Sequence, residues 1–262
     1  MYLDLHDVRR AFGEDEFYPF FQPFVALESR QLTGFEALAR WNHGRLGALA
    51  PDAFIPIVQK CGYINTLTQK LLHKIFAAAP LIQGTLRLSI NLSPLQLMDE
   101  TLPGQISSAA QKGGFLLQRL TIEMTQSALL DDLRTAQSVA GEMKSMNCRL
   151  ALDNFGTGHS SLFHLMALPF DELKIDRSFV HAVDQNGDSR KIVAALVNLA
   201  KSLGMTTVAQ GVETEEQAVI MGDLGCELAQ GWLFGKPGAA SEIPRMIAEV
   251  AGDRAENLCD AI

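Results

Sequence analysis

The sequence predicts an α/β protein folded as a single (β/α)₈ barrel, and three observations support this prediction. The chain has 262 residues, a usual length for one such barrel. Hydrophobic residues form 47% of the chain and charged residues 20%, a balance typical of a globular domain with one large core. Strand-like and helix-like segments alternate, which indicates a parallel sheet with right-handed crossovers. An open, doubly wound sheet is the alternative, but about eight strands over this length favour a closed barrel.

Apolar and β-branched runs mark the expected strands, at residues 20–25, 35–38, 86–92, 120–124, 149–153, 172–175, 206–209 and 227–230. Amphipathic segments between them predict helices at residues 51–60, 63–79, 102–112, 130–146, 189–203, 215–224 and 241–250. Three of these helices are followed directly by a glycine that can end them, at Gly113, Gly204 and Gly225. Residues 1–16 predict a short helix or linker, and residues 17–262 the barrel domain.

Charge and composition narrow the class of partner. The formal net charge is −8 and no basic stripe is present, which argues against binding to duplex nucleic acid. A small phosphate ligand is compatible with this charge, because a metal ion or a few local cations can hold it. No stretch of about 18 apolar residues occurs, so we expect no membrane span. The cysteines are isolated from one another and the N-terminus lacks the apolar core of a signal peptide, so we expect a cytoplasmic protein.

Polar residues recur where the expected strands end. They are Asn91, Glu123, Asp153, Lys174, Gln210 and Gln230. The carboxyl ends of parallel barrel strands open on one face, where the active sites of this fold are built, so these side chains are expected to converge at one mouth. Carboxylate and amide oxygens suit Mg²⁺ or Mn²⁺ rather than zinc. Two such ions about 3.5–4 Å apart would clamp both oxygens of a phosphodiester displacement, and a lysine beside them can orient the attacking water.

An ordered set of motifs resembles the EAL family. Residues 35–41 read FEALARW and contain the Glu-Ala-Leu-x-Arg-Trp signature of that family. Further motifs follow in family order: FQP at 21–23, FIP at 54–56, NLS at 91–93, EMT at 123–125, DNFGTG at 153–158, KIDRSF at 174–179, GVET at 211–214 and QGWLFGKP at 230–237. A lone Glu-Ala-Leu has little specificity, whereas this set, which spans about residues 17–250, is highly specific.

The resemblance implies a barrel with one antiparallel strand, cyclic di-GMP as ligand, and hydrolysis of one phosphodiester to linear pGpG with two Mg²⁺ or Mn²⁺ ions. It places metal ligands at Glu36, Asn91, Glu123, Asp153 and Asn154. It gives Lys174 a role in assisting the attacking water, places Gln210 where a catalytic glutamate stands, and makes Gln230 a support for the metal-bound cluster. Contacts to the nucleotide, or to the loop that holds it, are implied for Gln22, Leu38, Arg40, Glu213, Phe234 and Pro237.

Two acidic positions of the family pattern are amides in this chain. Asn154 stands where the family has the second of two consecutive aspartates, and Gln210 where it has a glutamate that is a metal ligand or general base. Three carboxylates remain instead of five to balance two divalent ions. Mg²⁺ prefers carboxylates, so we expect one metal ion to bind and a second to bind weakly or not at all. Because Gln210 cannot accept a proton, we expect hydrolysis to be weak or lost.

Three functions stay open at this point, and so does enzymatic activity itself. The first is a cyclic di-GMP receptor with little or no hydrolysis, which would act on a regulatory protein partner. The second is an active phosphodiesterase that tolerates both amides, with Asn154 coordinating through its oxygen. The third is a protein-interaction module without nucleotide binding, against which the retention of Glu36, Arg40 and Lys174 argues. The resemblance also points to a homodimer.

Overall fold

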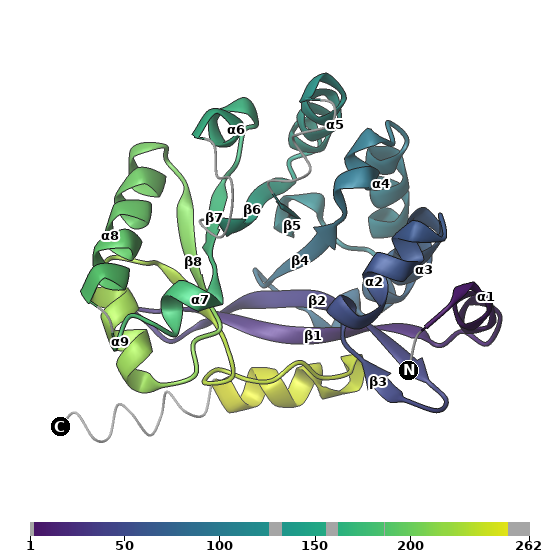
Figure 1. Cartoon of the computed structure of the whole chain (residues 1–262), viewed down its shortest axis with the longest axis horizontal. Helices are drawn as coiled ribbons and strands as arrows, with labels where there is room; N and C mark the ends of the chain where they lie inside the picture. The colour runs from purple at the N-terminus through teal and green to yellow at the C-terminus, as the bar shows by residue number, and fades with distance from the viewer. Residues whose placement is uncertain (1–2, 126–132, 156–161, 186, 251–262) are drawn as a thin grey trace.

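A closed barrel of eight strands forms the centre of the molecule, with helices around it (Figure 1). The computed structural model describes residues 3–125, 133–155, 162–185 and 187–250. The barrel strands are β1 (Phe17–Ala26), β2 (Leu32–His43), β4 (Arg87–Leu92), β5 (Leu120–Thr125), β6 (Arg149–Phe155), β7 (Glu172–Ile175), β8 (Thr206–Gln210) and β9 (Leu228–Gln230). The short strand β3 (Gly47–Leu49) pairs with the far end of β2, outside the barrel.

Strand β1 closes the barrel, because it pairs with both β2 and β9. It runs antiparallel to both of these neighbours, whereas the pairs from β2 through β4 to β9 are all parallel. The expected barrel with one antiparallel strand is therefore confirmed, and the open-sheet alternative is wrong. Because β1 and β2 form a hairpin, the first two strands need no helical crossover.

The helices connect the strands on the outside of the barrel (Figure 1). They are α1 (Leu5–Gly13), α2 (Pro51–Lys60), α3 (Ile64–Ala77), α4 (Leu102–Lys112), α5 (Leu133–Ser145), α6 (Leu162–Ala167), α7 (Arg177–Val180), α8 (Gly187–Ser202), α9 (Glu215–Asp223) and a last helix over 243–250. Single 3₁₀ turns lie at η1 (Ala79–Leu81), η2 (Pro94–Met98), η3 (Leu117–Arg119) and η5 (Ala240–Glu242). Among the described residues, none of these helices has the length and apolar character of a membrane span.

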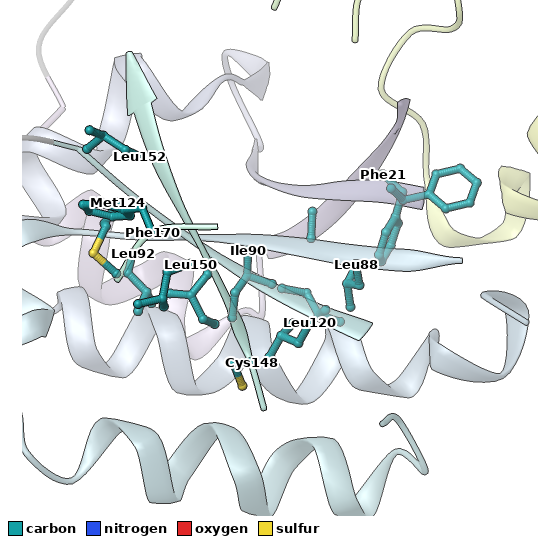
Figure 2. Packing of buried hydrophobic residues seen from close by; sticks show 14 of the residues in the cluster. Phe21, Leu88, Ile90, Leu92, Leu120, Met124, Cys148, Leu150, Leu152 and Phe170 are labelled. Carbon is teal, nitrogen blue, oxygen red and sulfur yellow. The ribbon is translucent and has the colours of Figure 1, made fainter. Parts of the chain in front are cut away.

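Alternation along the parallel strands separates an apolar row from a polar row. On β4, β5 and β6 the apolar row includes Leu88, Leu92, Leu120, Leu150 and Leu152, all at most 4% exposed. Figure 2 shows side chains of this row gathered in one layer. The residues between them are small or polar and point to the other face, because successive strand residues face opposite sides. The same register that buries the leucines therefore brings Asn91, Glu123 and Asp153 to the barrel interior.

A buried ion-pair network holds the base of the barrel, opposite the mouth. Glu172, the first residue of β7, has a side chain only 4% exposed. Its Oε1 accepts from Arg87 Nη1 at 2.5 Å and from Arg149 Nε at 2.7 Å. Arg87 and Arg149 are the first residues of β4 and β6, so one carboxylate joins the beginnings of three strands.

Substitution of Glu172 by alanine should destabilise the fold by about 3 kcal/mol, because two arginines would keep partly buried charges without a partner. Chemical denaturation of Glu172→Ala measures this loss. Glu142→Ala, an exposed position on α5, is the matched control and should change the free energy of unfolding by less than about 0.5 kcal/mol. Equal stability of the two variants would contradict a structural role for the network.

Candidate functional site

The buried ammonium group of Lys174 joins two carboxylates from other strands at the barrel mouth. Lys174 lies on β7, with a side chain only 3% exposed. Its Nζ donates to Glu36 Oε2 on β2 at 3.0 Å and to Glu123 Oε2 on β5 at 2.5 Å. These strands are not sequential neighbours, so only barrel closure brings the three side chains together.

Two amides flank Glu36. Asn91 Nδ2 donates to Glu36 Oε1 at 2.6 Å, a bond that does not use the Asn91 amide oxygen. Gln230, buried at the end of β9, lies on the same side of the mouth. Its amide nitrogen has no hydrogen-bond partner of normal geometry among the described residues, although it is near enough to Glu36 to help lower the pKa of that carboxyl.

The amides of Gln210 and Asn154 both donate to Asp153. Gln210 Nε2 reaches Asp153 Oδ1 at 2.8 Å, and Asn154 Nδ2 reaches Asp153 Oδ2 at 3.0 Å. The pairing of β6 with β7 shifts between Leu152 and Phe155, and Asn154 adopts a φ of 55° in this irregularity. Asparagine tolerates this left-handed conformation better than most residues. The shift leaves Asp153 buried and Asn154 exposed.

Burial and charge move the pKa values of the cluster in opposite directions. Burial, reinforced by the charge of Glu36, holds the pKa of Glu123 well above its ordinary value despite Lys174. Burial also raises the pKa of Asp153, partly offset by Lys174. Burial would raise the pKa of Glu36 too, but the charge and hydrogen bond of Lys174, with help from Asn91, leave it lowered. Burial lowers the pKa of Lys174 less than the surrounding carboxylates raise it.

The donor set of this cluster fits one hard divalent cation better than two. Glu36, Glu123 and Asp153 together with Lys174 leave two formal negative charges, which one divalent ion balances and two would exceed. Oxygen donors of this kind suit Mg²⁺ or Mn²⁺. Because the nitrogens of Asn154 and Gln210 face Asp153, these two amides act as hydrogen-bond donors here.

A second group of potential metal ligands, Asp4, His6 and Asp7, lies at the start of α1. Asp7 already contacts Arg10 Nη1 at 3.3 Å and Arg45 Nη2 at 3.5 Å. These cations neutralise the carboxylate, which makes the group less suited to hold a metal ion.

The residues expected to contact a nucleotide lie around the cluster. Gln22 pairs across the hairpin with Glu36, and its Nε2 donates to Gly235 O at 3.2 Å. Leu38 and Arg40 follow on β2 and are half-buried. Burial lowers the pKa of Arg40, whose Nη1 donates to Ala39 O at 2.8 Å. Within the described part of the chain, no carboxylate lies within ion-pair distance of Arg40.

Phe234, Pro237 and Glu213 lie on the loops that follow β9 and β8. These loops approach closely at Gly231, where any Cβ atom would lie 1.9 Å from Val212 O. Phe234 and Pro237 are half-buried, whereas Glu213 is exposed, with Oε1 3.6 Å from His181 Nε2. Both loops therefore stand beside the cluster rather than inside it.

A cavity of about 430 Å³ opens beside the cluster and extends beneath α2 and α3. Of the expected site residues it is lined by Glu36, Leu38, Asn91, Asp153 and Asn154. The other expected site residues lie outside its lining: Gln22, Arg40, Glu123, Lys174, Gln210, Glu213, Gln230, Phe234 and Pro237. Sequence reasoning missed Tyr18 and Phe20, which lie half-buried on β1; their signal was the alternation of positions 18, 20 and 22 in one strand.

Comparison with known proteins decides the family. A family model described as the EAL domain matches residues 5–237. The chain belongs to the EAL domain family. An uncharacterised signalling protein of Caulobacter vibrioides is 37% identical over 231 residues, 88% of this chain and 29% of that protein. The cyclic di-GMP phosphodiesterase RocR of Pseudomonas aeruginosa is 35% identical over 235 residues, 88% of this chain and 60% of that protein.

Solved structures agree with the family assignment. The PaMucR phosphodiesterase in its c-di-GMP complex matches this EAL domain with a TM-score of 0.85 at 32% identity, over 91% of this chain and 98% of that one. The EAL enzyme Bd1971 in its cAMP- and cyclic-di-GMP-bound form matches with a TM-score of 0.88 at 28% identity, over 92% of this chain and 67% of that one. This EAL domain spans 28–36% of the length of four of its curated relatives.

Replacement of Lys174 by methionine should cost about 3–5 kcal/mol of stability at neutral pH in metal-free buffer, because buried carboxylates would lose their counter-charge. The loss should shrink as the pH falls. Without Lys174 the folded-state pKa of Glu36 would rise above its unfolded value, and that of Glu123, already raised, would rise further. Buried carboxyls with raised pKa values destabilise the fold as the pH rises from the unfolded pKa towards the folded one, so the cost is smallest at low pH.

Denaturant unfolding at several pH values between about pH 5 and pH 8 tests this dependence. Lys191→Met, at a side chain 81% exposed, is the matched control and should leave the pH profile unchanged. A Lys174→Met variant whose stability loss is the same at every pH would contradict the electrostatic explanation.

Proposed function

We propose that this EAL domain binds cyclic di-GMP at the barrel mouth and that its hydrolysis of that ligand is weak or lost. The observation that carries the second part is that the two groups hydrogen-bonded to Asp153 are uncharged amides. Gln210 and Asn154 donate to Asp153, where two family carboxylates would have supplied acceptors for cations. Such amides reduce both the charge and the proton-accepting capacity of the site.

The proposal of binding rests on Arg40 and on the relatives. Arg40 is a half-buried cation at the mouth without a carboxylate partner among the described residues, and an anionic ligand would supply its missing counter-charge. The relative RocR is named a cyclic di-GMP phosphodiesterase, and PaMucR was solved with c-di-GMP bound. We propose the same ligand for this chain, with Gln22, Leu38, Phe234 and Pro237 around the bases and Glu213 holding the loop.

In the proposed site, Glu36, Asn91, Glu123 and Asp153 would hold one Mg²⁺ or Mn²⁺ ion. Such an ion polarises a phosphodiester oxygen and lowers the pKa of a coordinated water. Lys174, fixed between Glu36 and Glu123, can orient a water beside the phosphate through its remaining proton. Gln210 can donate a hydrogen bond but cannot remove a proton, so deprotonation of the nucleophile lacks its protein base.

Two alternatives stay open for experiment. An active phosphodiesterase is favoured by the relatives and by the complete set of Glu36, Glu123, Asp153 and Lys174. A protein-interaction module without nucleotide binding would leave the buried cluster without a purpose. We also propose, as consequences of a receptor function, a regulatory protein partner, a cytoplasmic location and a homodimer, each open to test by fractionation and light scattering.

Calorimetric titration of cyclic di-GMP in Ca²⁺, followed by assays of pGpG release in Mg²⁺ and in Mn²⁺, separates the three functions. We expect binding with little or no product. Arg40→Ala should weaken binding by roughly 10- to 150-fold, which corresponds to the free energy of a hydrogen bond to a charged group. Arg245→Ala is the matched control, because Arg245 is 64% exposed and contacts Glu242 and Glu249 on its own turn and helix. Turnover at ordinary enzyme rates would overturn the receptor proposal.

The paired variant Asn154→Asp with Gln210→Glu should raise pGpG release by about 10²–10⁴-fold, because it restores a general base and two carboxylates. The rate of the paired variant should also depend more steeply on Mg²⁺ concentration, because the added carboxylates can balance the charge of a second ion. Gln230→Glu is a control for added charge alone and should not restore turnover. A paired variant that stays inert would falsify the assignment of lost activity to these two positions.

A further inference from the structure

The β1–β2 hairpin presents one row of side chains from each strand to the barrel mouth. Three cross-strand pairs form this mouth ladder: Tyr18 with Arg40, Phe20 with Leu38, and Gln22 with Glu36. Along this part of β1, buried residues alternate with half-buried ones, and Tyr18, Phe20 and Gln22 are the half-buried set. Directly paired residues of an antiparallel pair have Cβ atoms about 4.5–5.5 Å apart, so each pair is in side-chain contact range.

Arg40 rests on an aromatic ring instead of a carboxylate. Its Cζ lies 5.5 Å from the centroid of the Phe20 ring, within the range of a cation–π contact. Tyr18 meets Phe20 edge-on, with centroids 5.4 Å apart and planes at 63°. Apart from Nη1, which donates to Ala39 O, Arg40 makes no other side-chain hydrogen bond within the described ranges.

This support keeps the positive charge of Arg40 available. A carboxylate partner would fix the guanidinium but would also neutralise it and occupy its N–H donors. A ring within cation–π range of the guanidinium restricts its position and leaves its N–H groups open to a ligand. Lys174, which is buried at the mouth, is already engaged by Glu36 and Glu123.

We infer that Phe20, held by Tyr18, is a positioning residue that keeps the Arg40 guanidinium aimed at a phosphate of the bound ligand. The inference rests on the proposed function, because it takes the phosphodiester of cyclic di-GMP as the partner of Arg40. Phe20 acts through Arg40 and makes no contact of its own with a reacting atom. It thereby sets affinity for the phosphate rather than the chemistry of hydrolysis.

The binding test compares Phe20→Leu with Phe20→Tyr, using calorimetry with cyclic di-GMP in Ca²⁺. Loss of the ring in Phe20→Leu should weaken binding by roughly 2- to 30-fold, the range of cation–π contacts. Phe20→Tyr keeps the ring and should bind within about twofold of the wild type. Leucine is also apolar, so it should be buried to a similar extent at this position. Equal unfolding midpoints for the two variants would confirm that both fold.

A double-mutant cycle separates positioning from direct contact. If Phe20 acts through Arg40, then Phe20→Leu should have no further effect on affinity in an Arg40→Ala background. If the same fold loss persists in that background, Phe20 contacts the nucleotide itself and the positioning role is overturned.

A ligand-free measurement keeps this inference distinct from the proposed function. The ¹⁵N–¹H signal of Arg40 Nε should shift in Phe20→Leu, because the ring current is lost, and should stay near its wild-type position in Phe20→Tyr. An unchanged Arg40 signal in Phe20→Leu would overturn the positioning role whatever the ligand. If the Arg40 signal shifts in Phe20→Leu but the wild-type protein binds no cyclic di-GMP, the contact between Phe20 and Arg40 is confirmed and the proposed function is overturned.

Discussion

The buried ammonium group of Lys174 is the interaction on which the barrel mouth depends. Barrel closure brings Glu36, on β2 across the barrel, and Glu123, on β5, to its Nζ, and both carboxylates are almost inaccessible to water. Isolated buried charges are strongly disfavoured, so this arrangement requires a counter-charge inside the protein or from a cation. The single positive charge of Lys174 balances one of the two negative charges of this carboxylate pair. The pKa of Glu36 is accordingly lowered, whereas that of Glu123 is raised.

The direction of hydrogen bonds around Asp153 extends the same balance to the other side of the mouth. A carboxylate only accepts hydrogen bonds when ionised, whereas an amide can also donate. With Asn154 and Gln210 in place, both oxygens of Asp153 receive protein donors within 3.0 Å. Carboxylates at those two positions would repel Asp153 unless cations stood between them. Asn154 and Gln210 thus give Asp153 an internal hydrogen-bond network, and in the function proposed above this network is compatible with ligand binding and unfavourable for general-base chemistry.

The β1–β2 hairpin joins core packing to the proposed ligand site through its two faces. One face buries Phe17 and Trp41, whose rings lie 5.1 Å apart, against the α2 residue Phe54. The opposite face carries the mouth ladder. Because the side-chain period of a strand is two, a slip of one residue would exchange the two faces, so the aromatic core also fixes the register of Arg40 and Glu36. The antiparallel closure by β1 is therefore part of the site as well as of the fold.

Much of the fold followed from local patterns. The helices α2 and α4 and the strand β7 begin and end at the residues that the patterns indicated, because caps, glycines and short apolar runs act over a few residues. The hairpin was less well predicted, because β1 and β2 are longer than expected and β3 was missed. The outer part of β2 contains polar residues such as Arg40 and Asn42, which weaken the apolar signal of a strand. This part pairs only with β1 and β3. The short helices α6 and α7 were also missed, because segments of four to six residues carry little periodic signal.

The sequence by itself determined the barrel, the family and the identity of the polar residues at the strand ends, because strand-end positions in a closed parallel barrel converge wherever the chain places them. Tertiary structure alone decided the partners: that Lys174 lies between Glu36 and Glu123, that two amides turn their nitrogens to Asp153, and that Arg40 rests on Phe20. Four of these five contacts join residues from 20 to 138 positions apart, and hydrogen-bond direction depends on the atoms that face each amide after folding. No local pattern in the chain encodes those distances.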